Sequence, residues 1–365
     1  MFKILIKKIK KLWKIKFLFY LPKKKNILLY DEANSHILKE IIKKDFNIIK
    51  IREIEIYFWI FIKQIIFFDF SYTTYCKNYI KHISPKVVIS INDGKVRFFE
   101  LKKFFKKIPF VIIQNGARDL SDFERFKFFK SRKFKCDLFF VLNKYYIKPY
   151  RKIIDSNYHI LGAYKNNIVK VNKSVKDNFL LISNYDPHTI NKARIVAHNK
   201  LLKLLNFYFS SSNKKLHILL RRKNSTQKEE MQFFRFFFGS NCVFQKTLNP
   251  FWKKSYRILD KYENIISMES TMGYEAISRK KKLAFFPPHL GHKYWFGWPK
   301  PFQKKYNFFV SKNFSYTEIK RVLDNVSNCS QSNWKKKYYN SIKDLQPIST
   351  DNMVFRKILS NLLKN

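Results

Sequence analysis

Small hydroxyl side chains, a glycine and an acid meet at a strand-to-helix junction in residues 264–280. This segment reads NIISMESTMGYEAISRK, an apolar run followed by a short polar turn and a helix-like stretch. Ser270 or Thr271 can cap the helix by accepting hydrogen bonds from its first N–H groups. Gly273, one of seven glycines in the chain, has no Cβ, so a ligand can approach the backbone closely. Free N–H groups and the helix dipole then favour a phosphate or diphosphate.

Glu275 adds a carboxylate that we expect in the first turn of the same helix. There it can accept hydrogen bonds from both ribose hydroxyls of a nucleotide, as an acid does in dinucleotide-binding folds. The alternative is an ordinary capped helix whose dipole favours the glutamate, and the local pattern does not decide between the two. The cations of residues 279–282 follow at the far end of the helix, where we expect them to complement the dipole.

Arg221 and Arg222 end a strand-like apolar run, HILLRR, in residues 217–222. Arginine side chains present a fork of donors that matches phosphate oxygens. Because side chains alternate along a strand, we expect one arginine to face the site and the other to face solvent. Glu229 and Glu230 follow at the head of the next predicted helix, and we interpret them as acids that the helix dipole favours.

A loop rich in proline and aromatic residues covers residues 285–301, FFPPHLGHKYWFGWPKP. His289 and His292 lie three residues apart without a third metal ligand nearby, so a structural or substrate-contacting loop is favoured over a metal site. Trp298 and its aromatic neighbours can stack on a base or a sugar face. They can equally fill the space between two domains.

Alternating strand and helix patterns must position these residues. In the first half of the chain, a helical pattern covers residues 35–44 with Ser35 as a possible N-cap. Strand-like runs that end in polar residues cover 26–32, 46–52, 86–93, 109–117, 136–143 and 158–164. Such a series predicts a parallel sheet with helices on both faces and a ligand site at the carboxyl ends of the strands.

A polar segment, residues 165–178, is the predicted linker, after which the pattern restarts. The second series of strand-like runs covers 179–186, 215–223, 241–246, 264–269 and 282–288. The predicted fold is therefore α/β, with two Rossmann-like domains that face each other across a cleft. The expected domains are residues 26–170 and 171–345, preceded by a leader of residues 1–25 and followed by a C-terminal helix, 346–365, that can pack back on the first domain.

The composition favours an anionic partner. A length of 365 residues fits two domains, and an apolar fraction of 46% argues against global disorder. The 74 Lys and Arg residues against 26 acids give a net charge of +48, which suits nucleic acid, phosphate-rich substrates or an anionic membrane; compositional bias that aids solubility is the alternative. Four cysteines without a CxxC pair favour a reduced, cytoplasmic compartment.

Residues 1–25 contain ten lysines and no acid. On a helical wheel Lys3, Lys7 and Lys14 lie opposite the apolar side chains, which predicts a basic amphipathic helix on an anionic membrane, contacting it through residues 1–20. A solvated leader is the alternative. The apolar run 54–70 is a buried helix or strand, or an interfacial segment, since it is too interrupted to span a membrane.

Four motifs together resemble a known family: IQNGAR (113–118), STMGYEA (270–276), RKKKLAFF (279–286) and FGWP (296–299). They resemble bacterial surface-carbohydrate (O-antigen) biosynthesis proteins, from about residue 26 to the C-terminus. That family is similar in outline to GT-B glycosyltransferases and, more remotely, to Kdo transferases and CDP-glycerol glycerophosphotransferases. The chain departs from the usual pattern at Lys280, where the family has glycine, and near Asn307.

The resemblance implies a metal-independent glycosyltransferase without a bound cofactor, which uses basic groups and a helix dipole. Its second domain would hold a nucleotide-sugar donor, with the diphosphate at the helix N-terminus, Glu275 on the ribose and an arginine on the leaving group. The implied donor-binding residues are Ser270, Thr271, Gly273, Glu275, Arg221 and Arg222.

The first domain would meet a lipid-linked or glycan acceptor on the inner face of the cell membrane. A general base is expected on a strand-end loop there, and Asp31, Asp93 and Glu32 remain open as candidates. The implied acceptor or cleft residues are Asn115, Gly116, Arg118, His289 and Trp298. Asn115-Gly116 is also a common turn dipeptide.

Transfer of a sugar in surface polysaccharide (O-antigen or capsule) biosynthesis is therefore the expected function. A nucleotide-sugar epimerase or a polyol-phosphate transferase of related fold is the alternative, although an epimerase has no need of a membrane-binding leader. A basic nucleic-acid-binding protein is a further alternative, but no nucleic-acid-binding module is recognisable, so nucleic acid is not the expected partner.

Overall fold

The chain forms two compact units, each continuous in space but not in sequence. The structure, a computed structural model, describes residues 15–52, 55–65, 68–69, 71–118, 123, 133–173, 176–187, 192–222, 224–247, 252–268, 270–287 and 307–364. The first unit comprises Met1–Asn115, Phe126–Ile168 and Ser349–Asn365, and the second comprises Gly116–Arg125 and Val169–Ile348. Residues 116–125, which we expected in the first domain, thus belong to the second unit.

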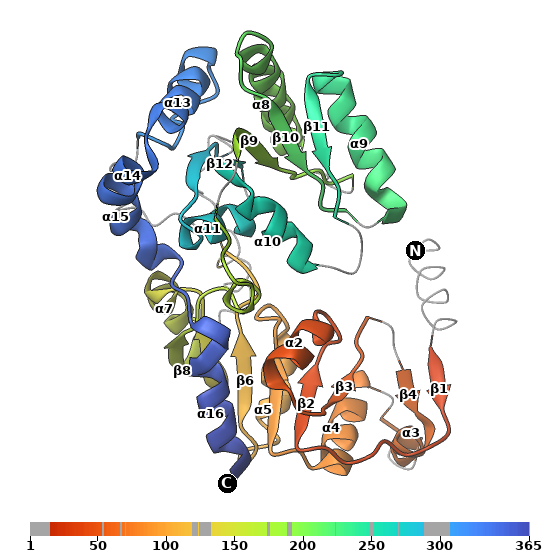
Figure 1. Ribbon diagram of the computed structural model, residues 1–365. Coiled ribbons are helices and arrows are strands. Elements are labelled where there is room, and N and C mark those ends of the chain that lie inside the picture. The colour runs from red at the N-terminus through yellow and green to blue at the C-terminus, as the bar shows by residue number, and fades with distance from the viewer. Residues whose placement is uncertain are drawn as a thin grey trace. The chain divides into compact units, whose positions relative to one another are not determined.

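The first unit is built on a parallel sheet whose described strands follow the order β3-β2-β5-β6-β7-β8 (Figure 1). These strands are Ile27–Tyr30 (β2), Asn47–Ile49 (β3), Val87–Ser90 (β5), Phe110–Ile113 (β6), Phe134–Val141 (β7) and Ile154–Ile160 (β8). Every residue of β2, β5 and β6 is buried, as expected for strands that are covered on both faces. The strand order reverses between β2 and β5, and ligands bind beside such a point in open α/β sheets.

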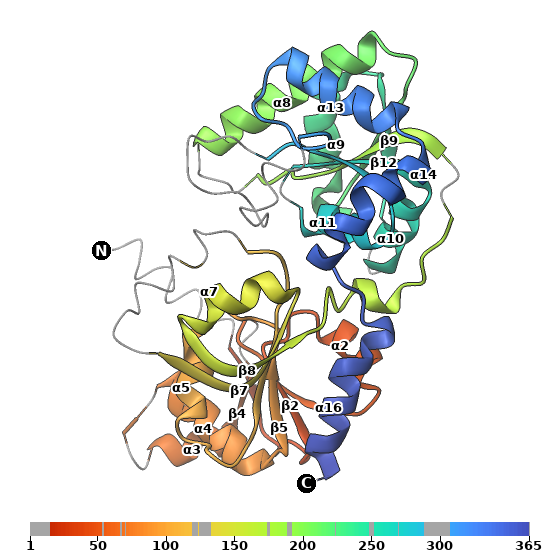
Figure 2. The same ribbon diagram turned by 90° about the vertical axis from the view of Figure 1, so that its left-hand side faces the viewer.

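Helices cover both faces of this sheet. The helices Ser35–Ile42 (α2) and Met353–Lys364 (α16) lie on one face, and Tyr72–Ile83 (α4) and Val96–Lys102 (α5) lie on the other (Figure 2). The short helix Ile147–Arg151 (α7) joins β7 to β8. The expected N-cap of α2 was wrong: Asn34, with φ 55°, holds the cap position, and Ser35 is the first helical residue.

A small two-stranded sheet lies outside the main sheet. Strand Lys16–Leu18 (β1) pairs in parallel with Glu55–Tyr57 (β4), and helix Phe58–Ile65 (α3) follows directly. The expected amphipathic helix falls largely on residues 1–14, outside the described residues. The later part of the expected leader contains β1 rather than helix, and the apolar run 54–70 contains both β4 and α3.

The second unit has its own parallel sheet, in which the described strands follow the order β11-β10-β9-β12-β13. Its strands are Lys176–Ile182 (β9), Leu216–Leu219 (β10), Cys242–Gln245 (β11), Tyr262–Ser267 (β12) and Lys282–Phe285 (β13). Counted from β9, this is the 3-2-1-4-5 order of a doubly wound dinucleotide-binding sheet. The order reverses between β9 and β12, so their carboxyl ends mark the expected ligand crevice.

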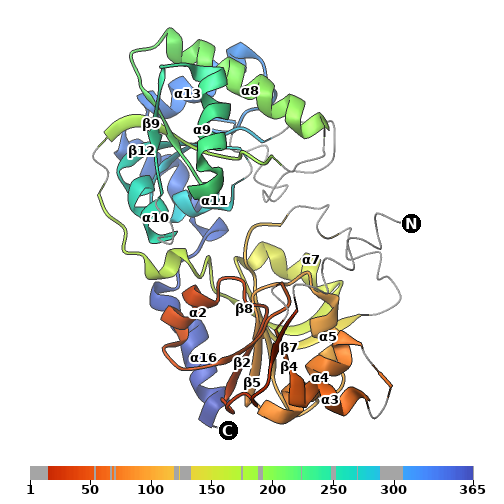
Figure 3. The same cartoon turned by 90° about the vertical axis from the view of Figure 1, so that its right-hand side faces the viewer.

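The helices of the second unit cover both faces of its sheet. Helices Lys192–Ser210 (α8) and Asn224–Phe238 (α9) lie together on one face, and Trp252–Asp260 (α10) and Thr271–Ser278 (α11) lie on the other (Figure 3). Helices Tyr316–Asn328 (α13), Gln331–Trp334 (α14) and Asn340–Ile342 (α15) complete the unit. The predicted α/β class with parallel sheets is confirmed.

The C-terminal segment returns to the first unit and is anchored there by asparagines. Asn352, which is fully buried, donates from Nδ2 to the Tyr164 carbonyl oxygen at 3.0 Å and accepts from Asn167 Nδ2 at 2.8 Å. Phe355 in α16 packs edge-on against Phe140 of β7. Within the described residues, no helix combines the length and apolar character that crossing a bilayer requires.

Candidate functional site

The junction between β12 and α11 forms a capped helix N-terminus at the strand-order reversal. Ser270 is extended, with φ −81° and ψ 131°, and its Oγ accepts a hydrogen bond from Met272 N at 3.3 Å. Of the two expected capping residues, Ser270 is therefore the N-cap and Thr271 is the first helical residue. The N-terminus of α11 carries the partial positive charge that suits an anion.

Gly273 allows α11 to pack closely on the end of β12. An ideal Cβ at Gly273 would lie 2.1 Å from Ser267 Oγ and 2.5 Å from Ser267 Cβ. Because real Cβ contacts are longer, any other residue would push the helix away from the strand. The need for glycine thus has a structural reason in helix–strand packing, independent of the ligand approach that we inferred from the sequence.

The two arginines that follow β10 have different partners. Arg221 Nη1 donates to Ser270 Oγ at 2.5 Å, which puts this exposed guanidinium at the N-terminus of α11. Arg222 donates from Nε and Nη2 to the Tyr185 carbonyl oxygen at 2.9 and 2.5 Å, and Nη2 also lies 3.0 Å from Asp186 Oδ1. Arg221 is therefore the arginine beside the helix N-terminus, whereas Arg222 holds the loop after β9.

A buried glutamate holds the backbone between the two arginines. Both oxygens of Glu230 accept the Arg221 N–H at 3.1 Å, and Oε2 accepts the Arg222 N–H at 3.0 Å. Oε1 also accepts a hydrogen bond from Ser183 Oγ at the end of β9. This role differs from the one inferred from the sequence, in which the helix dipole favours Glu230. Its helical spacing from the buried Phe234 and Phe237 is the signal that could have revealed a carboxylate on the core-facing side of α9.

Glu275 is buried and already holds a hydrogen bond within the unit. Tyr256 donates its hydroxyl to Glu275 Oε2 at 2.7 Å. Burial and the neighbouring Glu275 carboxylate raise the pKa of Tyr256 well above its ordinary value, so Tyr256 remains a neutral donor. We expected Glu275 in the first turn of α11, but it lies in the second turn, and the first turn carries no acid.

The IQNGAR segment crosses from the first unit to the second at Gly116. The N–H of Ala117 donates to Thr271 Oγ1 at 3.2 Å, and a Cβ at Gly116 would lie 3.0 Å from the same oxygen. Arg118 Nη1 reaches the Ala117 carbonyl oxygen at 3.4 Å. Thr271, expected on the donor, and Gly116, expected on the acceptor, therefore lie side by side within the second unit.

Asp31 lies at the strand-order reversal of the first unit in a strained conformation, with φ 91°. Arg52 donates to its carboxylate from Nε at 3.0 Å and from Nη2 at 3.2 Å, and Ala33 N donates at 3.0 Å. Burial alone would raise the pKa of Asp31, but these donors and the Asn92 amide hold it below its usual value. Asp31 is thus ionised at neutral pH and paired with an arginine.

The other two candidate bases also have partners in the first unit. Glu32 accepts the Ile51 and Arg52 N–H groups, each at 2.8 Å. Asp93 is fully buried and accepts a hydrogen bond from the Tyr150 hydroxyl.

Asn115 belongs to a polar network of the same unit. Its Oδ1 accepts from the Tyr164 hydroxyl at 2.9 Å and from Asn34 Nδ2 at 3.3 Å. Asn34 and Asp31 both follow β2, so the acceptor candidate Asn115 and the base candidate Asp31 are linked to the same strand-end loop.

The cations after α11 are not simple dipole partners, which corrects the expectation for residues 279–282. Arg279 is buried and donates to Asp260 from Nε at 2.7 Å and from Nη2 at 2.5 Å. Lys281 Nζ donates to the Asp260 carbonyl oxygen at 2.6 Å, and burial lowers the pKa of Lys281 to about 8 although Asp260 opposes this shift. Lys282 pairs with Glu263 at 3.0 Å. These residues join α10, α11 and β13.

The family assignment follows from the length of the match. Residues 111–363 match the model of the family described as "putative O-antigen biosynthesis protein", which is well over half of the chain. The chain belongs to this O-antigen biosynthesis family. Among curated proteins, none matches the sequence.

Solved structures show that this O-antigen family member has a GT-B fold. A Listeria monocytogenes protein described as a putative UDP-N-acetylglucosamine 2-epimerase has a TM-score of 0.56 at 11% identity, covering 94% of this chain and 98% of that one. Methanocaldococcus jannaschii UDP-GlcNAc 2-epimerase, in complex with UDP-GlcNAc and UDP, has a TM-score of 0.55 at 13% identity over 92% and 99%. A Rickettsia africae glycosyltransferase has 0.51 at 10% identity over 94% and 100%.

Two expected site residues of the O-antigen family member, His289 and Trp298, lie outside the described residues. Where the structure does describe the chain, no group of three His, Cys, Asp or Glu side chains is placed to hold a metal ion. The described arrangement offers two distinct chemistries: an arginine and a helix N-terminus suited to an anion in the second unit, and carboxylates at a strand-end loop in the first.

Proposed function

We propose that this protein is a glycosyltransferase that uses a nucleotide-sugar donor in surface polysaccharide biosynthesis. The observation that carries the proposal is the Arg221 guanidinium, 2.5 Å from Ser270 Oγ at the N-terminus of α11. The arginine and the helix dipole supply positive charge for a diphosphate at the point where the strand order reverses. The same groups would stabilise the charge on a departing nucleotide, so the proposed reaction needs neither a bound metal nor a cofactor.

The donor-binding residues that we propose form two groups: residues that would contact the donor, and residues that hold the helix or loop beside it in place. Ser270 and Thr271 would border the diphosphate together with Arg221, while Gly273 lets the helix N-terminus sit close to the strand end. Arg222 would act through the loop that it holds after β9. Glu275 would accept the ribose hydroxyls, with the Tyr256 hydrogen bond at 2.7 Å keeping its second carboxylate oxygen in place.

The acceptor is proposed to be a lipid-linked or glycan hydroxyl that meets the first unit. A general base must reach that hydroxyl, and Asp31, Asp93 and Glu32 remain the candidates. Asp31 is favoured because it lies at the strand-order reversal and is ionised, while its lowered pKa makes it a weak base as long as Arg52 is bound to it. Its bond to Arg52 would have to loosen when the acceptor binds.

Asn115, Gly116 and Arg118 are proposed to contact the acceptor, with Arg118 on its phosphate. His289 and Trp298 remain proposed contacts from the aromatic loop. The basic N-terminal segment, with residues 1–20 on an anionic bilayer, would keep the enzyme on the inner face of the cell membrane, where a lipid-linked acceptor is found.

Nucleotide binding is the experiment that tests the donor site. Nucleoside diphosphates and UDP-, GDP- and CMP-sugars are screened by thermal shift, and a ligand at 100 times its dissociation constant should stabilise the protein by about 2.7 kcal/mol. Arg221→Gln should weaken the best ligand by roughly tenfold or more, because a charge-assisted hydrogen bond is lost. Titration calorimetry of both proteins measures the difference.

Lys228→Gln, which removes an exposed cation from the neighbouring helix α9, is the matched control and should leave affinity unchanged. Absence of any nucleotide response, or equal losses in the two variants, would refute the donor site. Acceptor-dependent release of free nucleotide supports transfer. Isomerisation of the sugar without an acceptor would make the protein an epimerase instead.

A further inference from the structure

The two-stranded sheet of β1 and β4, together with the start of α3, exposes a cluster of large apolar side chains. Phe17, Phe19, Tyr20, Leu21 and Trp59 are 43%, 68%, 61%, 51% and 49% exposed, respectively. We call these five residues the β1–β4 patch. All belong to β1, to the segment after it, or to the start of α3, so the patch is one continuous feature of the first unit.

The patch is held in a defined shape by its own contacts. Strand β1 pairs in parallel with β4, with Phe17 opposite Ile56. The ring of Phe19 lies 5.2 Å from that of Phe58, and Trp59 Nε1 donates to the Phe19 carbonyl oxygen at 2.8 Å. Because the indole N–H is satisfied and the backbone is paired, the exposed rings are a preformed surface rather than a loose segment.

The charges around the patch are predominantly positive: β4 contributes one acid, Glu55 opposite Lys16, and it is paired with Lys50 at 2.7 Å. Lys16, Lys23, Lys24 and Lys63 are exposed, and neither residues 15–25 nor residues 57–65 contain an acid. Amphipathic rings beside lysines are the combination that binds at the headgroup level of an anionic bilayer. Because Glu55 is paired with Lys50, the exposed lysines leave a net positive charge beside the rings, which favours an anionic bilayer as the partner.

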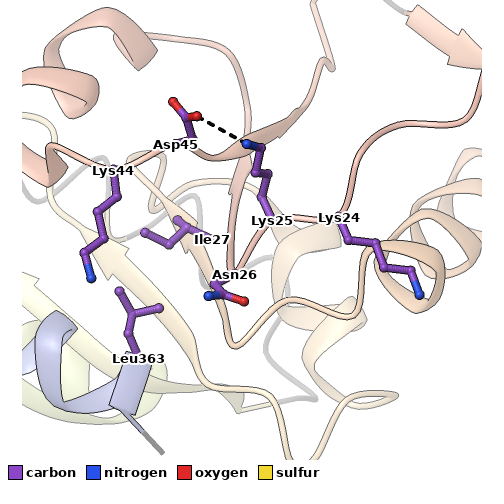
Figure 4. A pocket seen from close by; sticks show the side chains of 7 residues that line it. All are labelled: Lys24, Lys25, Asn26, Ile27, Lys44, Asp45 and Leu363. Atoms are coloured by element: carbon purple, nitrogen blue, oxygen red, sulfur yellow. Dashed lines mark hydrogen bonds and ion pairs between the residues drawn. The ribbon is translucent and has the colours of Figure 1, made fainter.

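A basic hollow of about 270 Å³ continues this surface along the chain (Figure 4). Lys24, Lys25 and Lys44 line it together with a single acid, Asp45, and with Leu363 at the end of α16. Only Lys25 reaches the acid, at 3.2 Å, while Lys24 and Lys44 extend away from it. The hollow therefore adds net positive charge to the segment that follows the patch in the sequence.

We propose that the β1–β4 patch is a membrane-docking surface whose partner is an anionic phospholipid bilayer. The aromatic side chains would enter the interface between headgroups and acyl chains, and the surrounding lysines would contact anionic headgroups. This inference rests on the proposed membrane-associated acceptor and deepens it, because it assigns membrane contact to the folded first unit in addition to residues 1–20.

Vesicle binding by the full-length chain tests the proposal. The unmodified protein should co-sediment with phosphatidylcholine vesicles that contain phosphatidylglycerol and much less with phosphatidylcholine alone. Phe19→Ser with Leu21→Ser should weaken binding by roughly tenfold or more, and Lys23→Gln with Lys24→Gln by about fivefold for each lysine. The Phe19 substitution preserves the Trp59 hydrogen bond, which uses the main-chain oxygen.

Phe207→Ser with Phe236→Ser is the matched control, since these phenylalanines of α8 and α9 are 61% and 82% exposed. This control should bind vesicles like the unmodified protein. Each variant should show the same nucleotide-induced thermal shift as the unmodified protein, which shows that it is folded and binds the donor. A loss of vesicle binding can therefore be distinguished from a loss of nucleotide binding.

Two results together would overturn the proposal. The variant Phe19→Ser with Leu21→Ser would bind anionic vesicles as tightly as the control variant does, and binding would be lost only in Lys3→Gln with Lys7→Gln of the N-terminal segment. The proposal is also overturned if the patch instead joins two copies of the chain. In that case light scattering would show a dimer that the patch variant abolishes, and vesicles would not bind.

Discussion

At the residue scale, Glu230 holds the backbone of Arg221, the arginine that we propose for the diphosphate. Its carboxylate accepts the main-chain N–H groups of Arg221 and Arg222 and the Ser183 hydroxyl, so one side chain fixes the carboxyl ends of β9 and β10 together. A fully buried carboxylate is stable only when such donors compensate for lost hydration. The position of the Arg221 side chain at α11 thus depends on a residue that contacts no proposed ligand.

Replacing Glu230 should therefore destabilise the second unit and weaken nucleotide binding. Glu230→Ala leaves two main-chain N–H groups and a hydroxyl unsatisfied, at about 1–3 kcal/mol for each buried group, so we expect a loss of about 3 kcal/mol or more. Urea unfolding gives the stability, and calorimetry gives nucleotide affinity. Glu229→Gln, at the exposed neighbouring position, should change stability by no more than about 0.5 kcal/mol. Similar losses in both variants would contradict this role.

The roles of single residues were the least predictable feature from sequence. Arg279 and Asp260 form a buried pair, with side-chain exposures of 0% and 1%, although the sequence shows only cations near a helix end. Asp31 similarly pairs with Arg52 from a different strand-end loop. Each such partner lies far along the chain, so local spacing carries no information about it.

At the element scale, strands were predictable because both sheets are parallel and buried. Runs such as ILLY and FVII are apolar throughout, which is typical of strands covered on both faces. Strand β1 was not predicted, because it has three residues, two of them exposed, and it pairs with β4 outside the main sheet. Strand β4 falls in the run 54–70, for which strand and helix were both left open. Lys280, which replaces the glycine of the family pattern, has φ 61°, a left-handed conformation that glycine adopts without strain.

The packing of α11 on β12 provides a test at the same scale. Gly273→Ala should cost about 1–3 kcal/mol or more, because the new methyl group overlaps Ser267. Nucleotide affinity should fall as well, since the helix N-terminus moves away from the strand end. In the described part of the chain, Ser267 Oγ is buried without a hydrogen-bond partner, so its removal is tolerable.

Ser267→Gly removes both overlapping atoms, and combined with Gly273→Ala it should recover much of the lost stability. A double-mutant cycle on urea unfolding measures this coupling. Additive effects in the cycle would show that α11 does not depend on this contact and would contradict the packing argument.

At the scale of the whole molecule, the candidate residues collect where each sheet reverses its strand order. Asp31 and Asp93 follow β2 and β5 in the first unit, and Ser183 and Ser270 follow β9 and β12 in the second. Ligands bind beside such points in open α/β sheets, so the topology places these residues at the edge of each sheet where a ligand is expected. The alternation of strands and helices in the sequence predicts the sheets and the strand ends that carry these residues, but not that residues 116–125 join the second unit.

The return of the C-terminal segment to the first unit yields a prediction for the whole chain. Asn352→Ala removes the donor to the Tyr164 carbonyl and the acceptor for Asn167, and it leaves these buried groups unsatisfied at about 1–3 kcal/mol each. Amides of α16 should then exchange hydrogen at least roughly tenfold faster, because undocking of this segment needs less free energy.

Met353→Ala, at a side chain that is 65% exposed, should leave exchange unchanged. Amides of β9 and β12 should keep their protection in both variants. Acceleration spread equally over both units would show that residues 349–365 stabilise the whole chain rather than the first unit.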